Sequence, residues 1–353
     1  MLDNINPHML VLGRESRGIS QSELANKIGI SQGKLSKAEK GEQTLPDDSF
    51  QRLYEYLEYP ETFFYQKTPT APVSHYYYRK RVTIPQKVMM QIEAAVKIFR
   101  RNIDSLSEAI ELPEFKLKAF NPEKESPEEI ARKCRYMLSI DRGPVPSLVN
   151  LLENNGVVIV KTDLFNEKID GLSTISEKGI HIIFLNERMP NDRQRFSLAH
   201  ELGHILMHFD IPTLSEQVEE EANRFASEFL MPKDEIINSL RGLNFSKLGE
   251  LKRYWNVSMK SLVRRARDLN TINDQQYRNL QIGFSKKGMS VSEPIQLQEE
   301  KSYILNQVIK LYLDELGYSI HELARIINLN ITEFENRFLV TDKPRLKIVR
   351  NIA

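Results

Sequence analysis

Residues 195–208 read R-F-S-L-A-H-E-L-G-H-I-L-M-H and constrain the chain more than any other segment. Apolar residues recur there at the spacing of one helix face, at Leu198, Leu202, Ile205 and Phe209. On the helix that this pattern predicts, His200 and His204 lie one turn apart, so two neutral imidazoles can reach one zinc ion. Glu201 lies about 100° around the helix, beside the metal, where a carboxylate can take a proton from a zinc-activated water.

His208 is the nearest candidate for a third ligand, but helical geometry argues against it. Two turns separate His200 from His208 by roughly 12 Å along the axis, which is too far for all three histidines to bind one ion. No glycine bend follows His204 to return a later histidine to the metal, as the metzincin pattern requires. We therefore expect His208 to pack or to support another residue. A catalytic zinc usually has three protein ligands and one open position, so the third should come from another helix.

Residues 216–232 offer that second helix, which Pro232 ends. Its buried stripe consists of Ala222, Phe225, Ala226 and Phe229. Glu219 and Asn223 are four positions apart and share a face at the border of this stripe. Glu219 is therefore the candidate third ligand, and the Asn223 amide could hold a ligand histidine in place. Glu221 and Glu220 are the alternatives.

These two segments also carry a family resemblance. The pattern R-F-S-L-A-H-E-L-G-H-x-x-x-H followed by E-x-E-A-N-x-F-A-x-x-x-L-M-P resembles the ImmA/IrrE family of zinc metallo-endopeptidases. The resemblance implies His200, His204 and Glu219 as the metal ligands and Glu201 as the catalytic base. It continues upstream through residues 143–146 and 170–173, and downstream to about residue 294.

Residues 20–41 contain two short helical patterns joined at a glycine. Ser20 and Glu23 form a capping box and Gly29 closes the first helix, while Ser31 is the natural N-cap of the second. This is the plan of a helix-turn-helix. The candidates for reading base edges are Gln32, Gly33, Lys34 and Ser36, and Gln21 is the candidate for binding a phosphate.

The same segment resembles the Cro/repressor-type (XRE) helix-turn-helix family through S-Q-S-E-L-A-x-x-x-G-I-S-Q-x-x-L-S-x-x-E-x-G. An ordinary small helical bundle is the alternative. Residues 1–60 hold seven Lys/Arg against nine Asp/Glu, a net charge of −2, so one copy should bind DNA weakly. Two copies on a palindromic operator, and hence a homodimer, would compensate. Residues 75–101 hold seven Lys/Arg and one acid, a net charge of +6, and either add phosphate contacts or form a solvated helix face.

The length of 353 residues predicts two or three domains. We expect a DNA-binding domain over 1–65, a linker and basic helical segment over 66–125, a peptidase domain over 126–295 and a helical appendage over 296–353. The single cysteine, Cys134, excludes an internal disulfide and fits a reducing cytosol. We expect it to be buried, with capping of the zinc as the alternative. No apolar run is long enough to cross a membrane, so the expected location is the cytoplasm.

Two β-branched runs behind glycines, residues 156–160 and 179–185, predict strands. The second precedes the metal helix and is either the edge strand on which a substrate peptide pairs or a buried central strand. His181 in this run lines the cleft or packs in the core. Basic residues after Pro232 are expected on a solvated face. Residues 320–331 echo residues 23–30 without the glycine, which favours an interaction or dimerisation appendage over a degenerate second helix-turn-helix.

The predicted fold is mainly α with a small β-sheet (α+β). An N-terminal helix-turn-helix bundle precedes a zincin-like metallopeptidase domain with the H-E-x-x-H helix and a helical C-terminal extension. The predicted function is DNA binding fused to zinc-dependent cleavage of a repressor or antitoxin-like protein that controls mobile-element or stress genes. A metal- or ligand-sensing regulator without catalysis and a toxin–antitoxin component are the alternatives.

Overall fold

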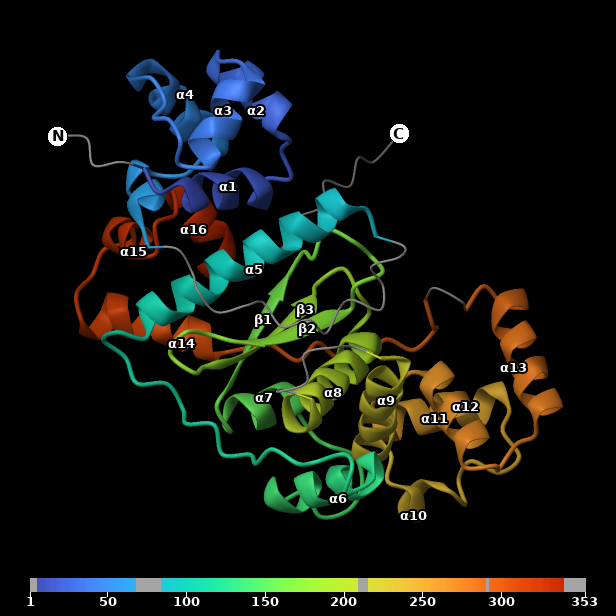
Figure 1. The fold of residues 1–353 in the computed structure, drawn as a ribbon. Coiled ribbons are helices and arrows are strands. Elements are labelled where there is room, and N and C mark those ends of the chain that lie inside the picture. The colour runs from blue at the N-terminus through green and yellow to red at the C-terminus, as the bar shows by residue number, and fades with distance from the viewer. Residues whose placement is uncertain (1–4, 68–83, 209–214, 290–291, 340–353) are drawn as a thin grey trace, which may run out of the picture.

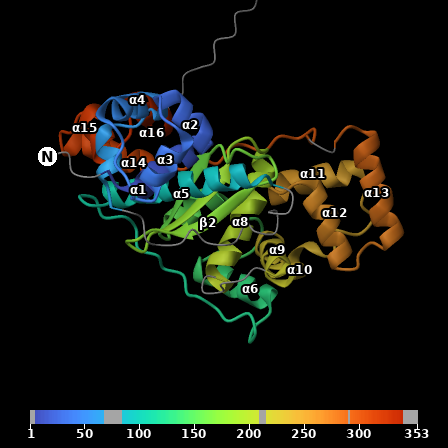
Figure 2. The ribbon, with the colours of Figure 1, turned by 45° about the horizontal axis from the view of Figure 1, so that its top comes forward.

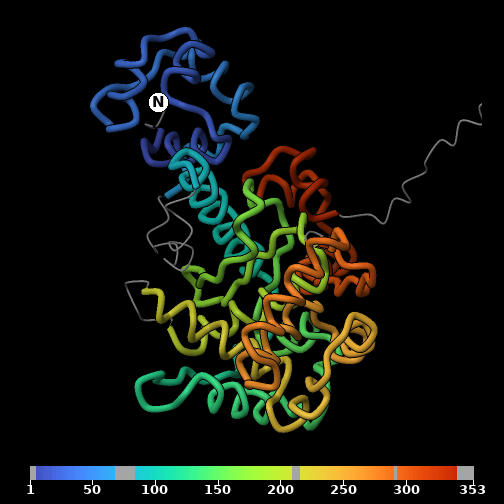
Figure 3. Tube along the Cα trace, turned by 90° about the vertical axis from the view of Figure 1, so that its right-hand side faces the viewer, coloured from blue at the N-terminus to red at the C-terminus, as the bar shows by residue number. Residues whose placement is uncertain are grey.

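The computed structural model describes residues 5–67, 84–208, 215–289 and 292–339. The chain is mainly α-helical with one small sheet, as predicted (Figure 1). The N-terminal bundle consists of α1 Pro7–Ser16, α2 Gln21–Ile28, α3 Gln32–Glu39, α4 Asp47–Leu57 and the 3-10 helix η1 Glu61–Tyr65. It stands at one end of the molecule (Figure 3). No helix of the described part of the chain is both long and apolar enough to cross a membrane.

A long helix, α5 Gln86–Leu106, lies between this bundle and the sheet (Figures 1 and 2). Phe99 on α5 packs edge-on against Phe184 of the sheet, with ring centroids 5.6 Å apart. The opposite side of α5 packs on α1. Because α1 and the sheet both cover α5, Arg100 of this helix is buried rather than solvated. The basic run at 79–81, on which the phosphate-contact alternative also rested, lies outside the described residues.

The sheet contains three described strands in the order β1-β3-β2: β1 Val157–Thr162, β2 Gly171–Ile175 and β3 His181–Asn186. β1 and β3 are parallel, and β2 is antiparallel to β3. β3 is therefore central among the described strands and almost entirely buried, so of the two alternatives for residues 179–185 the buried central strand is confirmed and the edge strand was wrong. The sequence signal also missed β2, a five-residue strand with Gly171 and polar Ser173 and Thr174 that lacks the run of β-branched residues seen in its neighbours. His181 packs against Phe115, with ring centroids 3.9 Å apart, and burial lowers its pKa to about 4.

A second group of helices shares a hydrophobic core with the other face of the sheet. They are α6 Pro127–Met137, α7 Leu148–Glu153, α8 Asn191–Met207 and α9 Glu216–Leu230, followed by α10 Lys233–Ile236, α11 Phe245–Trp255, α12 Met259–Asp268 and α13 Asp274–Lys286. α6 begins with a complete capping box, formed by Ser126 and Glu129. Cys134 on α6 is fully buried in the core, and burial raises the pKa of its thiol.

The basic residues after Pro232 do not all lie on a solvated face. Lys252 is 1% exposed and pairs with Asp192 and Glu293, with 2.7 Å from its Nζ to the Glu293 carboxylate. Arg265 is equally enclosed and pairs with Glu228. Helical periodicity could not reveal this, because the partner acids come from distant segments.

The chain ends in a second helical group that returns to the N-terminal bundle. It comprises α14 Ile304–Lys310, the π-helical turn η3 Leu311–Glu315, α15 Ile320–Ile326 and α16 Ile331–Phe338. These helices lie beside α1 and α5 (Figures 1 and 2). Phe338 reaches Phe99, with ring centroids 5.6 Å apart. The N-terminal bundle, α5, the C-terminal helices and one face of the sheet therefore share one hydrophobic core.

Candidate metal centre and nucleic-acid interface

The H-E-x-x-H segment lies on α8, which packs closely along α9. Gly203 makes this approach possible. A Cβ atom at this position would lie 3.0 Å from the Phe225 ring of α9, closer than almost any real side chain. The glycine inside the motif thus positions the second helix, which the sequence identified as the source of the third ligand.

Three side chains meet between α8 and α9. His200 Nε2 and His204 Nε2 are 3.0 Å apart. The carboxylate of Glu219 lies 3.7 Å from the first and 3.4 Å from the second. In the described part of the chain, these residues form a group whose donor atoms all lie within 4.8 Å of one another. The structure therefore brings together the three residues that the sequence proposed.

Each histidine is held through its other ring nitrogen. Asn223 Oδ1 lies 3.1 Å from His200 Nδ1, the contact expected from the spacing of Glu219 and Asn223. His208 Nδ1 lies 3.1 Å from His204 Nδ1, and His208 Nε2 lies 2.9 Å from Glu221. Both ligand candidates thus direct Nε2 towards the shared space and Nδ1 towards a support, the usual arrangement around metal-bound histidine.

Burial favours the neutral form of the His204 and His208 imidazoles. It lowers the pKa of His204 to about 3, with a smaller contribution from His208. It also lowers the pKa of His208, while Glu221 opposes that shift. Neutral imidazole is the form that binds a metal. Of the two alternative ligands, Glu221 is engaged with His208, and Glu220 lies 3.7 Å from Arg264 on the surface.

Glu201 occupies a different side of α8 and faces the sheet. Its Oε2 accepts a 2.8 Å hydrogen bond from the hydroxyl of Ser173 on β2, and it is 5% exposed. Gly171 lies beside it, where a Cβ atom would lie 3.5 Å from Glu201 Cγ and 2.9 Å from the carbonyl of Phe184. Sequence reasoning did not assign a role to Ser173, because no local pattern links a serine to a glutamate 28 positions later. Only the family resemblance covered this position.

The donor set fits zinc. Two imidazole nitrogens and one carboxylate oxygen form a three-ligand set typical of catalytic zinc, with a fourth position left for water or substrate. A cavity of about 870 Å³ lies on the far side of Asn223, between α9 and α12, and none of the three candidate ligands lines it.

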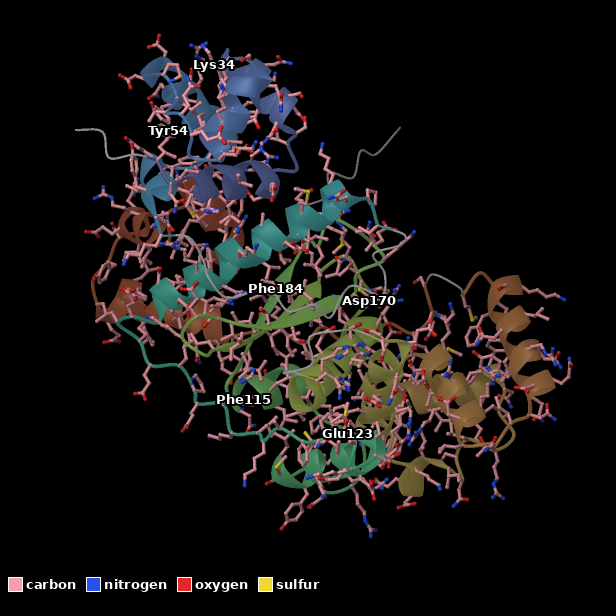
Figure 4. All side chains as sticks on the ribbon, in the orientation of Figure 1. Lys34, Tyr54, Phe115, Glu123, Asp170 and Phe184 are labelled. Carbon is pink, nitrogen blue, oxygen red and sulfur yellow. The ribbon has the colours of Figure 1, made fainter. Side chains whose placement is uncertain are left out.

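The helix-turn-helix also has the predicted local construction. Ser20 and Ser31 accept hydrogen bonds from the third residue of α2 and α3, and Gly29 is left-handed with φ of 76°. The front of α3 is accessible: Gln32, Gly33 and Lys34 are exposed and Ser36 is half-buried. Figure 4 places Lys34 at the outer end of the bundle, far from the sheet.

Gln21 connects the two helices of this motif. Its amide donates to Glu39 at 2.6 Å, and Gln32 donates to Gln21 at 2.8 Å. Glu39 is in turn buried against Arg14. The chain of hydrogen bonds fixes the side chain of Gln21 next to that of Gln32, on the side of the bundle where both were predicted to meet DNA.

Two family models match the segments that contain these residues. Residues 152–267 match the IrrE N-terminal-like domain of peptidase family M78, and residues 12–64 match a helix-turn-helix domain. No curated protein matches the chain. The class of protein is thus a DNA-binding domain joined to a metallopeptidase-family domain. More particularly, residues 152–267 are similar to IrrE-type peptidase domains and residues 12–64 to helix-turn-helix domains, which confirms for these segments the resemblance noted in the sequence.

Proposed function

We propose that the protein is a zinc-dependent endopeptidase with a sequence-specific DNA-binding domain. The observation that carries the proposal is the convergence of His200, His204 and Glu219, together with Glu201, the residue after His200 on α8, whose buried carboxylate Ser173 holds. A metal-storage or structural site would need the three ligands but not a buried carboxylate next to them. We assign metal binding to the first three residues and proton transfer to Glu201.

Zinc bound there would polarise the peptide carbonyl and lower the pKa of the attacking water. Glu201 accepts the proton of that water and delivers it to the leaving amine. Ser173 positions the Glu201 carboxylate through the 2.8 Å hydrogen bond to Oε2. Asn223 and His208 orient the two imidazoles.

The proposed substrate is a transcriptional repressor or antitoxin-like protein that enters as an extended segment. β2, rather than β3, is the strand to which we assign peptide pairing. It lies at an edge of the described sheet and carries Ser173, the residue bonded to Glu201.

For DNA, we propose that Gln32, Gly33, Lys34 and Ser36 meet base edges and that Gln21 binds a phosphate. The net charge of −2 over residues 1–60 limits the affinity of one copy. A homodimer on a palindromic operator remains our expectation for tight binding.

The test compares Glu201→Gln with His204→Ala in cells that produce the protein together with its neighbouring genes. New protein N-termini are quantified by mass spectrometry, and reporter transcription is measured in parallel. A peptidase predicts that wild type creates new N-termini and that both variants abolish them and the transcriptional response. General-base loss is commonly worth about 10²–10⁴ in rate, so slow residual cleavage by Glu201→Gln is compatible.

A metal-sensing regulator predicts a different pattern. There, Glu201→Gln retains the wild-type transcriptional response because it keeps all three ligands, and only His204→Ala loses it. That outcome, without new N-termini in wild type, would overturn the catalytic proposal. Zinc content of purified Glu201→Gln, expected at about one per chain, confirms that the variant differs in the base alone.

A further inference from the structure

The C-terminal helices repeat the construction of the N-terminal helix-turn-helix. In the first unit, Ser20 caps α2, a left-handed Gly29 follows nine positions later, and Ser31 caps α3 two positions after that. In the second unit, Ser319 caps α15, a left-handed Asn328 follows after the same nine positions, and Asn330 caps α16 two positions after that. A left-handed glycine also precedes the first cap of each unit by two positions: Gly18 with φ of 63° before Ser20, and Gly317 with φ of 71° before Ser319.

The cores and turns of the two units correspond as well. Fully or almost fully buried residues occupy matching positions, in the pairs Leu24 and Leu323, Ala25 and Ala324, Ile28 and Ile327, and Leu35 and Phe334. The turn of each unit is closed by the same backbone hydrogen bond. Ile30 N–H donates to Ala25 at 3.0 Å, and Leu329 N–H donates to Ala324 at 2.9 Å. Asn328 replaces the glycine of the turn because asparagine tolerates the left-handed conformation better than most residues.

The two units differ where a helix-turn-helix meets DNA. The three lysines of the α3 region, Lys34, Lys37 and Lys40, correspond to Glu333, Asn336 and Leu339. The polar pair Gln21 and Gln32 corresponds to Ile320 and Ile331, which pack against the hydrophobic core. An acidic residue in place of a lysine repels phosphate. The second unit therefore retains the fold of the motif without its phosphate-binding charge.

Glu333, the residue that corresponds to Lys34, contacts the first unit. Glu333 Oε2 accepts from Arg17 Nη2 at 2.7 Å, and Glu333 Oε1 accepts from Arg17 Nη1 at 3.1 Å. Both side chains are largely buried, at 12% and 21% exposed. The Arg17 guanidinium also lies 4.2 Å from the centre of the Tyr59 ring. Asn330, the cap of α16, donates to the backbone carbonyl of Glu58 at 2.7 Å.

We propose that residues 304–338 are a second helix-turn-helix unit that binds the first unit of the same chain instead of DNA. The contact of α16 with the ends of α1 and α4 holds the DNA-binding unit against α5, and the outer end of α3 points away from the peptidase domain (Figures 1 and 4). The partner of this surface is thus the N-terminal unit, and the pairing of Arg17 with Glu333 is its central polar contact.

The first arm of the test measures docking by amide hydrogen exchange in the full-length protein. Glu333 also pairs with Arg337 on its own helix. Glu333→Arg therefore places three cations together in a largely enclosed contact, so exchange in α1 and α16 should accelerate by roughly tenfold or more. Glu335→Arg makes the same charge change at an exposed position of the same helix and should leave both helices unchanged. Adding Arg17→Glu to Glu333→Arg should restore much of the protection.

A global loss of structure would show as faster exchange in α8 and α9 as well. Glu333→Gln then serves as the milder variant, with a smaller acceleration confined to α1 and α16. Equal exchange in Glu333→Arg and Glu335→Arg would overturn the proposed docking role.

The second arm asks whether the second unit reads DNA. Binding to a duplex that covers the promoter of the protein's own gene is measured for Asn336→Ala and Lys34→Ala, which occupy the recognition helices of the two units. Docking predicts that Asn336→Ala binds within about twofold of wild type while Lys34→Ala binds more weakly. An equal loss in both variants would show that the second unit contacts DNA and would overturn the proposal.

Discussion

The support of the metal ligands gives a prediction that needs no knowledge of the substrate. In Asn223→Ala, the Nδ1–H of His200 loses its 3.1 Å acceptor. Removal of such a support typically lowers metal affinity by about 10–100-fold, or roughly 1.4–2.7 kcal/mol. The His200 side chain is 15% exposed, so water can replace the amide oxygen in part. We therefore expect Asn223→Ala to lose zinc affinity by about tenfold, the lower end of that range.

His208→Ala should have the larger effect. The His204 side chain is 1% exposed, and the ring of His208 supports it from a fully buried position. Water cannot readily replace that support, so we expect His208→Ala to lose zinc affinity by about 100-fold, the upper end of the range. Both variants should still bind about one zinc per chain at saturation, since neither removes a proposed ligand.

The assay is competition for zinc with a chromogenic chelator, combined with metal analysis at saturation. Gln275→Ala, an exposed change on α13, is the control for purification and handling. Wild-type affinity in Asn223→Ala, or a weaker effect of His208→Ala than of Asn223→Ala, would refute the reasoning from exposure. Loss of stoichiometric zinc from a correctly folded His208→Ala would make His208 a ligand and would overturn the proposed ligand set.

Four further outcomes follow from the described contacts. Glu219→Ala should lose most bound zinc in metal analysis, and retention would exclude it as the third ligand. Lys252→Met leaves the buried carboxylates of Asp192 and Glu293 without their cation and should lower the free energy of unfolding, measured in urea, by about 3–5 kcal/mol. Burial raises the pKa of Glu153 to about 7, above its unfolded value, so the stability that the protonated carboxyl contributes is present at low pH and is lost as pH rises from about 4.5 to 7. Glu153→Gln should reduce this fall in the free energy of unfolding, by at most about 3 kcal/mol, in urea titrations at several pH values. Lys34→Ala should weaken promoter binding and reduce the slope of log affinity against log salt by about 1 in titrations at several salt concentrations.

Local patterns identified the parts of the site that depend on one helix. The spacing of His200 and His204 follows from helical periodicity alone, and the caps at Ser20, Ser31 and Ser126 are short-range hydrogen bonds that a sequence displays directly. Pairing the two segments as neighbours required chemistry, namely the need of a catalytic zinc for a third ligand. The structure places Glu219 where that need predicted it.

Features that depend on contacts between distant segments could not be predicted from the sequence. The order β1-β3-β2 comes from parallel pairing of two strands with a third strand between them in the chain, and no periodicity encodes such an order. Ser173 reaches Glu201 only because β2 pairs beside β3. Lys252 reads as a surface residue of α11, yet two acids from other segments enclose it. The similarity of residues 320–331 to the first helix-turn-helix was visible, but Asn328 in place of the glycine concealed its strength until the backbone angles were known.

The arrangement of the two sites bears on how one could influence the other. The first turn of α3, with Lys34, lies at the outer end of the N-terminal bundle (Figure 4), whereas α8 and α9 lie beyond α5 and the sheet (Figures 1 and 2). DNA bound at the front of α3 would therefore leave the metal site uncovered. A signal between the sites would instead pass through elements that touch both halves. α5 is the strongest candidate, because Phe99 contacts Phe184 on one side and Phe338 of the C-terminal unit on another. Residues 304–338 would then set the position of the DNA-binding unit on α5, and a change in the sheet beside Glu201 would reach that unit through a continuous packed core.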